Sequence, residues 1–397
     1  MSTSSELLRE PAVSGRTSQH TPRASSPIRF TASGSEYFRI WIVNLVLVVL
    51  TLGLYAPWAR VRKLRYFYGN TLVLGSPLDF HGRPWTMLRG YLLGGLLLLA
   101  YSGAGQISVG AATVSALLLA AVWPALARAS LQFRLSNTSW RGLRFRFEGS
   151  TKDSYLAWLP LALPFVLFSV MQALGPHSDH PPAPGSYEEK QFFAVMGFAF
   201  LAVSLLFPWG HWSLKRYQLG HMRFGERRSE FLARVGHFYS LAMQTGALAV
   251  GCIVLVFAAV LILVFTIKFQ KDELGMLGLL PIAAIYFAAL VAFNAFGTVR
   301  LQNLVWSNTR LPGAIALRSE LRVRSLVWLT ARNILLMALT LGLYWPFAVV
   351  ARARLRLQSI TVDALIDVDD FTSSAQLASH DAAGDAVGEL IGIDMGL

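Results

Sequence analysis

The sequence predicts an all-α integral membrane protein, a multi-pass helical bundle with internal repeats and short cytoplasmic β-hairpins. Hydrophobic residues make up 54% of the 397 residues and charged residues only 14%, whereas a soluble domain carries roughly 25% charge. The apolar residues form long runs with almost no charge, such as 241–267 and 274–296. Runs of this length are typical of membrane-spanning helices, so the surplus apolar surface requires lipid.

The formal net charge of +13 favours a membrane over a nucleic acid as the partner. Lys and Arg occur in short clusters directly after apolar runs, for example Lys215 and Arg216. Such clusters keep the loops that carry them in the cytoplasm. We therefore expect the lipid bilayer, and no nucleic acid, as a partner, with both termini in the cytoplasm.

The two ends of the chain differ from its apolar middle. Residues 1–28 are rich in Ser, Thr, Pro and Arg and lack an apolar stretch behind the charges, which predicts a disordered tail and not a signal peptide. Residues 369–397 are acidic and rich in small side chains, which predicts a second flexible tail. The membrane domain is expected over 29–368.

Two apolar segments far apart in the chain are near copies of each other. Residues 44–55 read NLVLVVLTLGLY, and residues 333–344 read NILLMALTLGLY. A Pro beside a Trp, followed thirteen residues later by Asn, His or Ser, occurs in four places: Pro57 and Asn70, Pro124 and Asn137, Pro208 and His221, Pro346 and Ser359. We therefore predict about five repeat units.

A glycine with strand-forming residues around it lies four or five residues after Asn70, Asn137, His221 and Asn308: Gly75, Gly142, Gly225 and Gly313. Glycine supplies the positive φ that tight hairpin turns require. The pattern predicts four short β-hairpins at the cytoplasmic surface of the membrane.

The stretches between consecutive hairpins are long enough for pairs of spanning helices in the three middle units. The expected pairs are 87–105 with 109–128, 155–174 with 191–212, and 237–267 with 275–298. The loops that connect them, 106–108, 175–190 and 268–274, carry few Arg, so we expect them outside the cell.

The first and last apolar segments, 38–59 and 326–350, allow two interpretations. Each is either one span, giving eight spans, or a short re-entrant pair folded at Thr-Leu-Gly-Leu beside six full spans. Single spans would place the equivalent basic clusters 60–65 and 352–356 on opposite sides. Re-entrant backbone keeps them on one side, but it is tolerated only where protein or water covers it.

Uncharged amides inside the apolar runs are candidates for a polar pathway: Asn44, Asn333, Gln244 and Asn294. Polar groups within a membrane are functional candidates by default, and the repeat puts Asn44 and Asn333 at matching positions. Hydrogen bonding between helices is the alternative role. No Asp or Glu lies within a predicted span, which disfavours an ion-coupled pump.

The basic clusters beside the first and last apolar segments are candidate contacts for anionic lipid headgroups, or they only orient the protein. They comprise Arg60, Arg62, Lys63, Arg65, Arg352, Arg354 and Arg356. In a predicted outer loop, His177, Asp179 and His180 have metal-binding side chains, but the surrounding prolines favour a plain solvated loop. Because no catalytic or phosphate-loop motif occurs, we predict no enzyme activity, metal or cofactor.

The stretch GSEYFRIWIVNLVLVVLTLGLYAPWARVRKLRYFYGNTLVLG, from Gly34 to Gly75, resembles the YjgN-type bacterial inner-membrane proteins, a family of unknown function. The similarity runs from about Phe30 to Val368. The resemblance implies an inner-membrane location and supplies no catalytic or binding residue.

Two functions follow from these patterns. Repeat-built membrane proteins are often transporters, so one hypothesis is a transporter or channel for an unknown solute, with a water-accessible cavity bordered by Asn44 and Asn333. The other is a scaffold that has a dry helical core and binds anionic lipid or an unknown protein partner through its basic cytoplasmic face.

Overall fold

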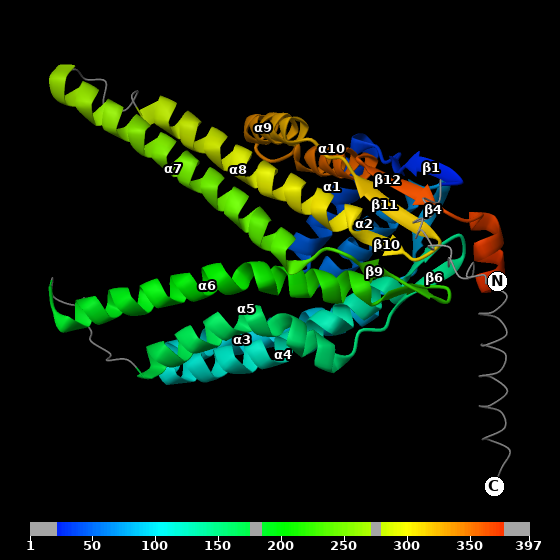
Figure 1. Cartoon of the computed structure of the whole chain (residues 1–397), viewed down its shortest axis with the longest axis horizontal. Helices are drawn as coiled ribbons and strands as arrows, with labels where there is room; N and C mark the ends of the chain where they lie inside the picture. Colours follow the sequence, from blue (N-terminus) through cyan, green and yellow to red (C-terminus); the bar gives the residue numbers. More distant parts are fainter. Residues whose placement is uncertain (1–21, 175–184, 271–278, 377–397) are drawn as a thin grey trace, which may run out of the picture.

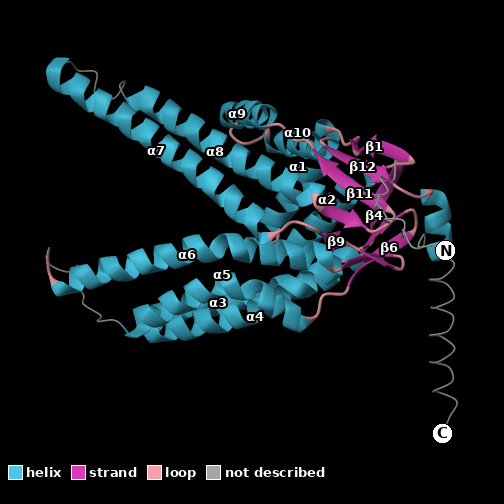
Figure 2. Cartoon of the chain, viewed as in Figure 1, coloured by secondary structure: helices cyan, strands magenta, loops and turns pink. Residues whose placement is uncertain are grey.

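The computed structural model describes residues 22–174, 185–270 and 279–376. Its strands gather at one end of the molecule, and the long helices project away from them (Figures 1 and 2). The helices are α1 (Gly34–Leu50), α2 (Ala56–Gly69), α3 (Pro84–Ile107), α4 (Val109–Ser136), α5 (Thr151–Leu174), α6 (Tyr187–Gly220), α7 (Val235–Gln270), α8 (Leu279–Ser307), α9 (Val323–Leu339) and α10 (Trp345–Gln358). The strands are β1 (Ala24–Pro27), β2 (Arg29–Phe30), β3 (Thr71–Val73), β4 (Ser76–Phe80), β5 (Thr138–Trp140), β6 (Leu143–Phe147), β7 (Met222–Phe224), β8 (Arg227–Arg228), β9 (Glu230–Phe231), β10 (Thr309–Leu311), β11 (Ile315–Ser319) and β12 (Ile360–Ala364).

Within these described residues, six helices are long and apolar enough to cross a membrane, and they are α3 to α8. Large apolar side chains cover their outer surfaces and remain exposed in the isolated chain. Such surfaces are stable only in contact with lipid. The prediction of a multi-pass helical membrane protein is confirmed, whereas most of the connecting loops 175–190 and 268–274 lies outside the described residues.

The first and last apolar segments each fold back on themselves. Leu52 and Gly53 have φ of 51° and 91° in the turn between α1 and α2, and the turn between α9 and α10 has the same conformation at residues 341–342. In the first turn Thr51 Oγ1 accepts a hydrogen bond of 3.0 Å from Tyr55 N, and Thr340 repeats this bond in the second. The Thr-Leu-Gly-Leu-Tyr sequence thus encodes a helix reversal, and neither segment is a single span.

The strands form a closed ring. The second strand of each hairpin pairs with the first strand of the next, as β4 with β5, β6 with β7 and β11 with β12. Single residues separate β8 from β9 and β1 from β2, so these two bent strands connect the two sheets. The sequence suggested separate hairpins, but pairing between neighbouring hairpins leaves only β1, β9, β2 and β8 at sheet edges among the described strands.

Both ends of the chain contribute to one hairpin of this ring. β12 pairs with β1 from Ala24↔Ala364 to Pro27↔Thr361. Residues 24–27 therefore lie in a strand, inside the region predicted as a disordered tail. The local sequence does not reveal this strand because its partner lies more than 330 residues away.

A repeated hydrogen bond fastens each hairpin to a helix. The backbone carbonyl two residues after the end of a hairpin accepts an N–H from a side chain on the preceding helix or, at the chain ends, from α10. The five donor and acceptor pairs are Arg65 with Gly82 (3.2 Å), Arg128 with Gly149 (2.7 Å), Trp212 with Ala233 (2.7 Å), Asn303 with Leu321 (2.9 Å) and Arg354 with Ala32 (2.7 Å).

The helices follow the same closed order. Each helix packs on the one before and the one after it, and α10 packs on α1. At this closure the rings of Phe38 and Phe347 lie 5.7 Å apart, and those of Trp41 and Trp345 lie 6.0 Å apart. Gly34 permits the approach, because a Cβ at that position would lie 2.6 Å from the Phe347 ring.

A short helix over residues 368–376 covers the turns of the hairpins. Asp367 Oδ1 caps it by accepting from Asp369 N at 2.9 Å, as acidic residues do at helix N-termini. Its apolar face comprises Val368, Phe371 and Ala375 and packs on the ring interior. The predicted tail boundary at 369 is therefore too early, because the acidic residues there cap a helix.

Candidate functional site

Basic side chains from three helices lie within electrostatic range of one another where these helices lead into the strand ring. The charges of Arg134 on α4 and Arg356 on α10 both act on the ammonium group of Lys215 on α6. Neither α4 nor α10 precedes or follows the other in the helix order. We call these three residues the central cationic site; Lys215 is half-buried, whereas Arg134 and Arg356 are exposed.

Two amides orient this site. Arg356 Nε donates a hydrogen bond of 2.6 Å to Gln302 Oε1, and Gln302 Nε2 donates to the Arg356 carbonyl at 2.9 Å. Gln302 is buried, so this contact holds the Arg356 side chain in one direction. Lys215 Nζ donates to Gln218 Oε1 at 3.3 Å.

Among the described residues, no carboxylate pairs with the central cationic site. None of its three residues forms an ion pair with Asp or Glu in the part of the chain that the structure describes. Like charges held together without a counter-charge repel one another and disfavour the folded state. Guanidinium and ammonium groups in this arrangement favour an anion, above all a carboxylate or phosphate.

The site lies where the helices meet the strand ring. Arg134, Lys215 and Arg356 are all within a few residues of the ends of α4, α6 and α10, and each of these helices leads directly into a strand. An anion bound here would lie between the membrane helices and the ring.

The structure separates the four predicted pathway amides. Asn44 and Asn333 are buried inside their own helix hairpins, where Arg62 Nη1 donates to Asn44 Oδ1 at 3.3 Å and Asn333 Nδ2 faces the Ala348 carbonyl at 3.5 Å. Gln244 and Asn294 are exposed on α7 and α8. No contact among the described residues joins these four amides.

Most of the predicted lipid-contact residues bind other parts of the chain. Arg60 donates to Tyr91 Oη at 3.1 Å, and Lys63 lies over the Phe67 and Trp345 rings. Arg62, Arg65, Arg354 and Arg356 make the bonds described above. Arg352 is exposed and makes no hydrogen bond or ion pair with any described residue.

Sequence reasoning missed Arg134 and Lys215 as members of a site. A signal was present, because Arg134 and Arg356 both lie ten residues after the proline of their unit, and Lys215 lies seven residues after Pro208. The repeat thus places them on equivalent helix faces. The candidate metal residues His177, Asp179 and His180 lie outside the described residues.

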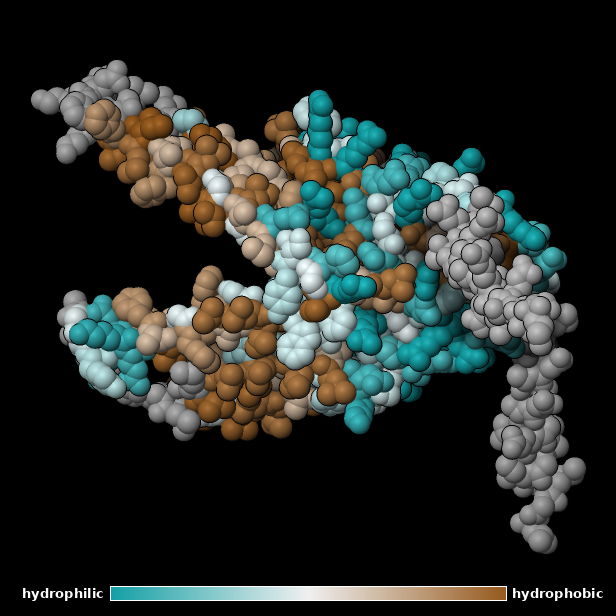
Figure 3. All heavy atoms as spheres, in the orientation of Figure 1, coloured by the Kyte–Doolittle hydropathy of each residue, from teal (hydrophilic) through white to brown (hydrophobic). Residues whose placement is uncertain are grey.

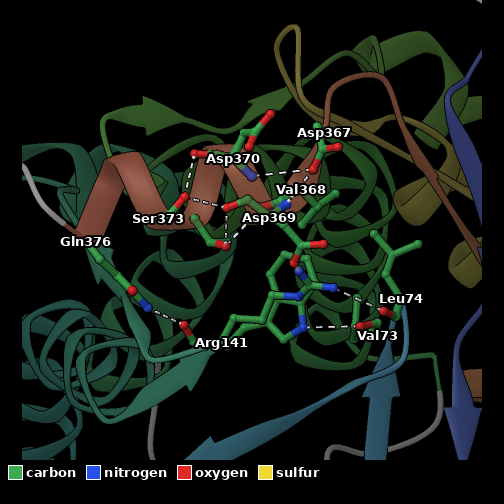
Figure 4. A network of polar contacts seen from close by, with 11 residues as sticks. Val73, Leu74, Arg141, Asp367, Val368, Asp369, Asp370, Ser373 and Gln376 are labelled. Carbon is green, nitrogen blue, oxygen red and sulfur yellow. Dashed lines mark hydrogen bonds and ion pairs between the residues drawn. The ribbon is translucent and has the colours of Figure 1, made fainter.

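The helix over 368–376 closes the far side of the strand ring (Figure 4). Arg141, in the turn of the β5–β6 hairpin, forms an ion pair with Asp369, and its carbonyl accepts a 2.6 Å hydrogen bond from Gln376 Nε2. On a second hairpin, the guanidinium of Arg227 lies 5.3 Å from the Phe371 ring. Polar and apolar contacts together seat the helix on the hairpin turns.

Comparison with known proteins places the chain in a family. Residues 25–390 match the bacterial proteins of unknown function called DUF898. The chain belongs to this family. A relative from Salmonella typhimurium strain LT2, the inner membrane protein YjgN, is 24% identical over 350 residues, covering 80% of this chain and 83% of that protein.

A shorter match links the chain to YjgN of Escherichia coli strain K12. The identity is 29% over 141 residues, which is 35% of this chain and 34% of that protein. No solved structure matches the chain. The DUF898 membership agrees with the resemblance found in the sequence. The names of both relatives state a location in the inner membrane and no activity.

Proposed function

We propose that this DUF898 protein is an inner-membrane transport protein that binds an anionic substrate at the central cationic site. The observation that supports this proposal is the electrostatic proximity of Arg134 and Arg356 to Lys215, on three different helices, without a carboxylate partner among the described residues. A cationic cluster inside a membrane protein attracts anions and raises their local concentration.

The position of the site favours transport over simple attachment. It lies near the ends of α4, α6 and α10, where the membrane helices lead into the strand ring. We place the strand ring in the cytoplasm, because the basic residues cluster there. The substrate would then bind at the cytoplasmic end of the membrane-spanning helices.

Reconstituted vesicles test the proposal. The full chain is inserted into liposomes, and two movements are measured: uptake of radiolabelled inorganic phosphate, and transfer of fluorescent phosphatidylglycerol between the leaflets. We expect one of them to exceed the rate in protein-free vesicles and to fall about tenfold or more in Lys215→Gln, because one charged contact contributes about 1.5–3 kcal/mol.

Arg216→Gln is the matched control. Arg216 is the next residue on α6, and its guanidinium lies 5.1 Å from the Trp212 ring, outside the central cationic site. Unchanged transport rates in this variant would show that the effect of Lys215→Gln comes from the central cationic site and not from a general loss of positive charge. If neither anion moves faster than in protein-free vesicles, transport is excluded for both probes and the proposal fails.

The second candidate function is a scaffold that binds anionic lipid or a protein partner through the basic face of α2 and α10. It is supported by Arg352, which is exposed and makes no hydrogen bond or ion pair among the described residues. Binding of the protein to anionic vesicles that depends on Arg352, without movement of either probe, would favour the scaffold.

We also propose that the five hairpin and helix units arose by duplication. The five equivalent hydrogen bonds from helix side chains to carbonyls support this. A second unit of this kind placed beside the first closes exposed strand edges, which gives a physical reason for retaining the copies.

A further inference from the structure

A polar cavity lies where the β3–β4 hairpin leads into α3 and meets the β5–β6 hairpin. Its volume is about 460 Å³, and its lining residues are His81, Arg83, Thr86, Phe133, Asn137 and Arg144. Arg144 lies between Leu143 and Phe145 in β6, and these two neighbours pack on the ring interior. Because side chains alternate along a strand, the cavity lies on the outer face of the ring. We call it the α3 pocket.

The arginines of the α3 pocket have no counter-charge among the described residues. Arg83 and Arg144 are exposed, and neither side chain makes a hydrogen bond or an ion pair with a described residue. Asp79 shares the outer face through its pairing with Ser139, but it forms no ion pair with either arginine. His81 Nε2 lies 2.8 Å from Ser139 Oγ, which fixes the imidazole beside the pocket. Two guanidinium groups beside one cavity favour an anion.

The next unit of the ring has an equivalent set of residues. The glycine carbonyls that accept the helix-to-carbonyl hydrogen bond align 81–86 with 148–153, and the strand register aligns Arg144 with Arg228. In the order given for the α3 pocket, the equivalent residues are Glu148, Ser150, Asp153, Tyr217, His221 and Arg228. The two sets can therefore be compared position by position.

The equivalent set contains its own anion. Asp153 Oδ2 accepts a 2.7 Å hydrogen bond from Ser150 Oγ and lies 3.8 Å from His221 Nε2. The charge of Arg228 also acts on Asp153. Glu148 forms an ion pair with an arginine of the neighbouring hairpin. In this unit, carboxylates of the chain itself neutralise the basic residues.

The α3 pocket keeps the basic side of this arrangement without the carboxylates. Thr86 stands where the next unit has Asp153, and Arg83 stands where it has Ser150. Ser150 Oγ also accepts from Asp153 N at 3.0 Å, whereas the Arg83 side chain does not cap α3. A bound anion would therefore supply both the missing carboxylate and the missing acceptor at the start of the helix.

We propose that the α3 pocket binds a phosphate group between Arg83 and Arg144, at the position that the Asp153 carboxylate occupies in the next unit. A phosphate offers several acceptor oxygens, and guanidinium groups bind them in pairs. The phosphate belongs either to the headgroup of an anionic phospholipid or to a free anion. This site shares no residue with the central cationic site, so the inference does not depend on the proposed function.

The depth of the pocket favours the lipid as the source. Figure 3 shows that the apolar surface of the long helices gives way to hydrophilic residues as they approach the strand ring. The pocket lies at this boundary, because Thr86 is in the first turn of α3, a candidate span. Trp85, the next residue, is 68% exposed, and tryptophan prefers the headgroup level of a bilayer. A headgroup phosphate at this level lies beside the pocket.

Two titrations of the full chain in detergent test this binding. Native mass spectrometry measures phosphatidylglycerol against zwitterionic phosphatidylethanolamine, and isothermal titration calorimetry measures inorganic phosphate. We expect preferential binding of phosphatidylglycerol, about tenfold weaker in Arg83→Gln and in Arg144→Gln. Arg146→Gln is the matched control, because Arg146 is exposed on the same strand and does not line the pocket. Lys215→Gln should also leave this binding unchanged.

Thr86→Asp provides the sharpest variant, because it gives the α3 pocket the carboxylate of the next unit. Thr86 is exposed, so the chain accommodates the substitution. We expect Thr86→Asp to weaken phosphate and phosphatidylglycerol binding about tenfold or more, whereas the neutral Thr86→Asn should have little effect.

The pattern of the two titrations identifies the source of the phosphate. Binding of phosphatidylglycerol that depends on Arg83 and is lost in Thr86→Asp supports a lipid headgroup. The same dependence for inorganic phosphate, without preferential binding of phosphatidylglycerol, supports the site with a free anion as its ligand. No binding of either probe, or binding that Arg83→Gln, Arg144→Gln and Thr86→Asp all leave unchanged, would overturn the inference.

Discussion

Arg354 Nη2 on α10 donates a 2.7 Å hydrogen bond to the carbonyl of Ala32, a residue 322 positions earlier in the chain. Ala32 is fully buried, so no water can replace this donor. The bond is the chain-closing member of the five helix-to-carbonyl hydrogen bonds, and it fastens the last helix to the first hairpin. The closed arrangement therefore depends on contacts between the two ends of the domain.

Arg354→Ala is expected to lower the free energy of unfolding by about 1–3 kcal/mol, because a buried carbonyl loses a charged donor. Thermal unfolding in detergent, followed by circular dichroism, measures the change. Arg352→Ala is the control, since Arg352 is exposed on the same helix and makes no hydrogen bond with any described residue. Equal losses in the two variants would show that the Ala32 contact contributes nothing specific.

The two equivalent asparagines are expected to respond differently to substitution. Asn44 Oδ1 accepts from Arg62, whereas Asn333 Oδ1 is buried and has no hydrogen-bond partner among the described residues. An unsatisfied buried oxygen costs about 1–3 kcal/mol. Asn333→Leu should therefore be neutral or stabilising, and Asn44→Leu should destabilise because it leaves the Arg62 guanidinium without its acceptor.

Melting temperatures of the two variants, compared with that of the unmodified protein, provide the measurement. A loss of stability in Asn333→Leu as large as that in Asn44→Leu would mean that the Asn333 side chain has a partner the structure does not contain, such as a water in a polar pathway. The experiment thus also addresses the predicted role of these amides.

The sequence predicted the membrane class because its signals are local. Runs of apolar residues, such as those in α7 and α8, are readable in a window of twenty residues. The turn at Thr51 is local too, since its hydroxyl bonds a backbone N–H four residues away. The two interpretations of 38–59 remained open because hydropathy does not distinguish a reversal from a helix end.

Features that depend on distant partners were not predictable in this way. Nothing near Ala24 indicates that it pairs with Ala364. Arg134, Lys215 and Arg356 look like ordinary flanking charges until the fold places the two arginines within electrostatic range of Lys215. Near Asp369 the composition predicted a flexible tail where the structure has a helix. Acidic and small residues are typical of tails but also of helix N-termini.

The contact between Gly225 and Ala375 predicts how the helix over 368–376 can be released. Gly225 has a φ of 60°, and a Cβ there would lie 3.0 Å from the Ala375 Cβ. Gly225→Val combines backbone strain with this close approach, and Phe371→Ala removes the largest apolar contact of the helix. Both variants are expected to speed hydrogen exchange of the 368–376 amides.

Mass spectrometry of the full chain measures the exchange rate of the 368–376 amides, with peptides from α5 as the internal reference. Ser374→Ala is the control, because Ser374 is exposed and its hydroxyl bonds only within its own helix. Unchanged exchange in both Gly225→Val and Phe371→Ala would mean that this helix is held by contacts other than its apolar face and the hairpin turn.

The strand ring fixes the topology of the two ends. Because β1 pairs with β12, and the helix over 368–376 sits on the hairpin turns, Ser26 and Ser374 must lie on the same side of the membrane. Gln106 lies at the far end of α3, a candidate span, so it should lie on the opposite side. A membrane-impermeant thiol reagent on intact cells, with single cysteines in a Cys252→Ser background, tests this. In intact cells we expect labelling at Gln106→Cys only. Ser26→Cys and Ser374→Cys should react only after permeabilisation. Labelling of Ser374→Cys but not Ser26→Cys from outside would require an odd number of spans between them and would contradict the closed ring, since paired strands cannot be divided by a bilayer.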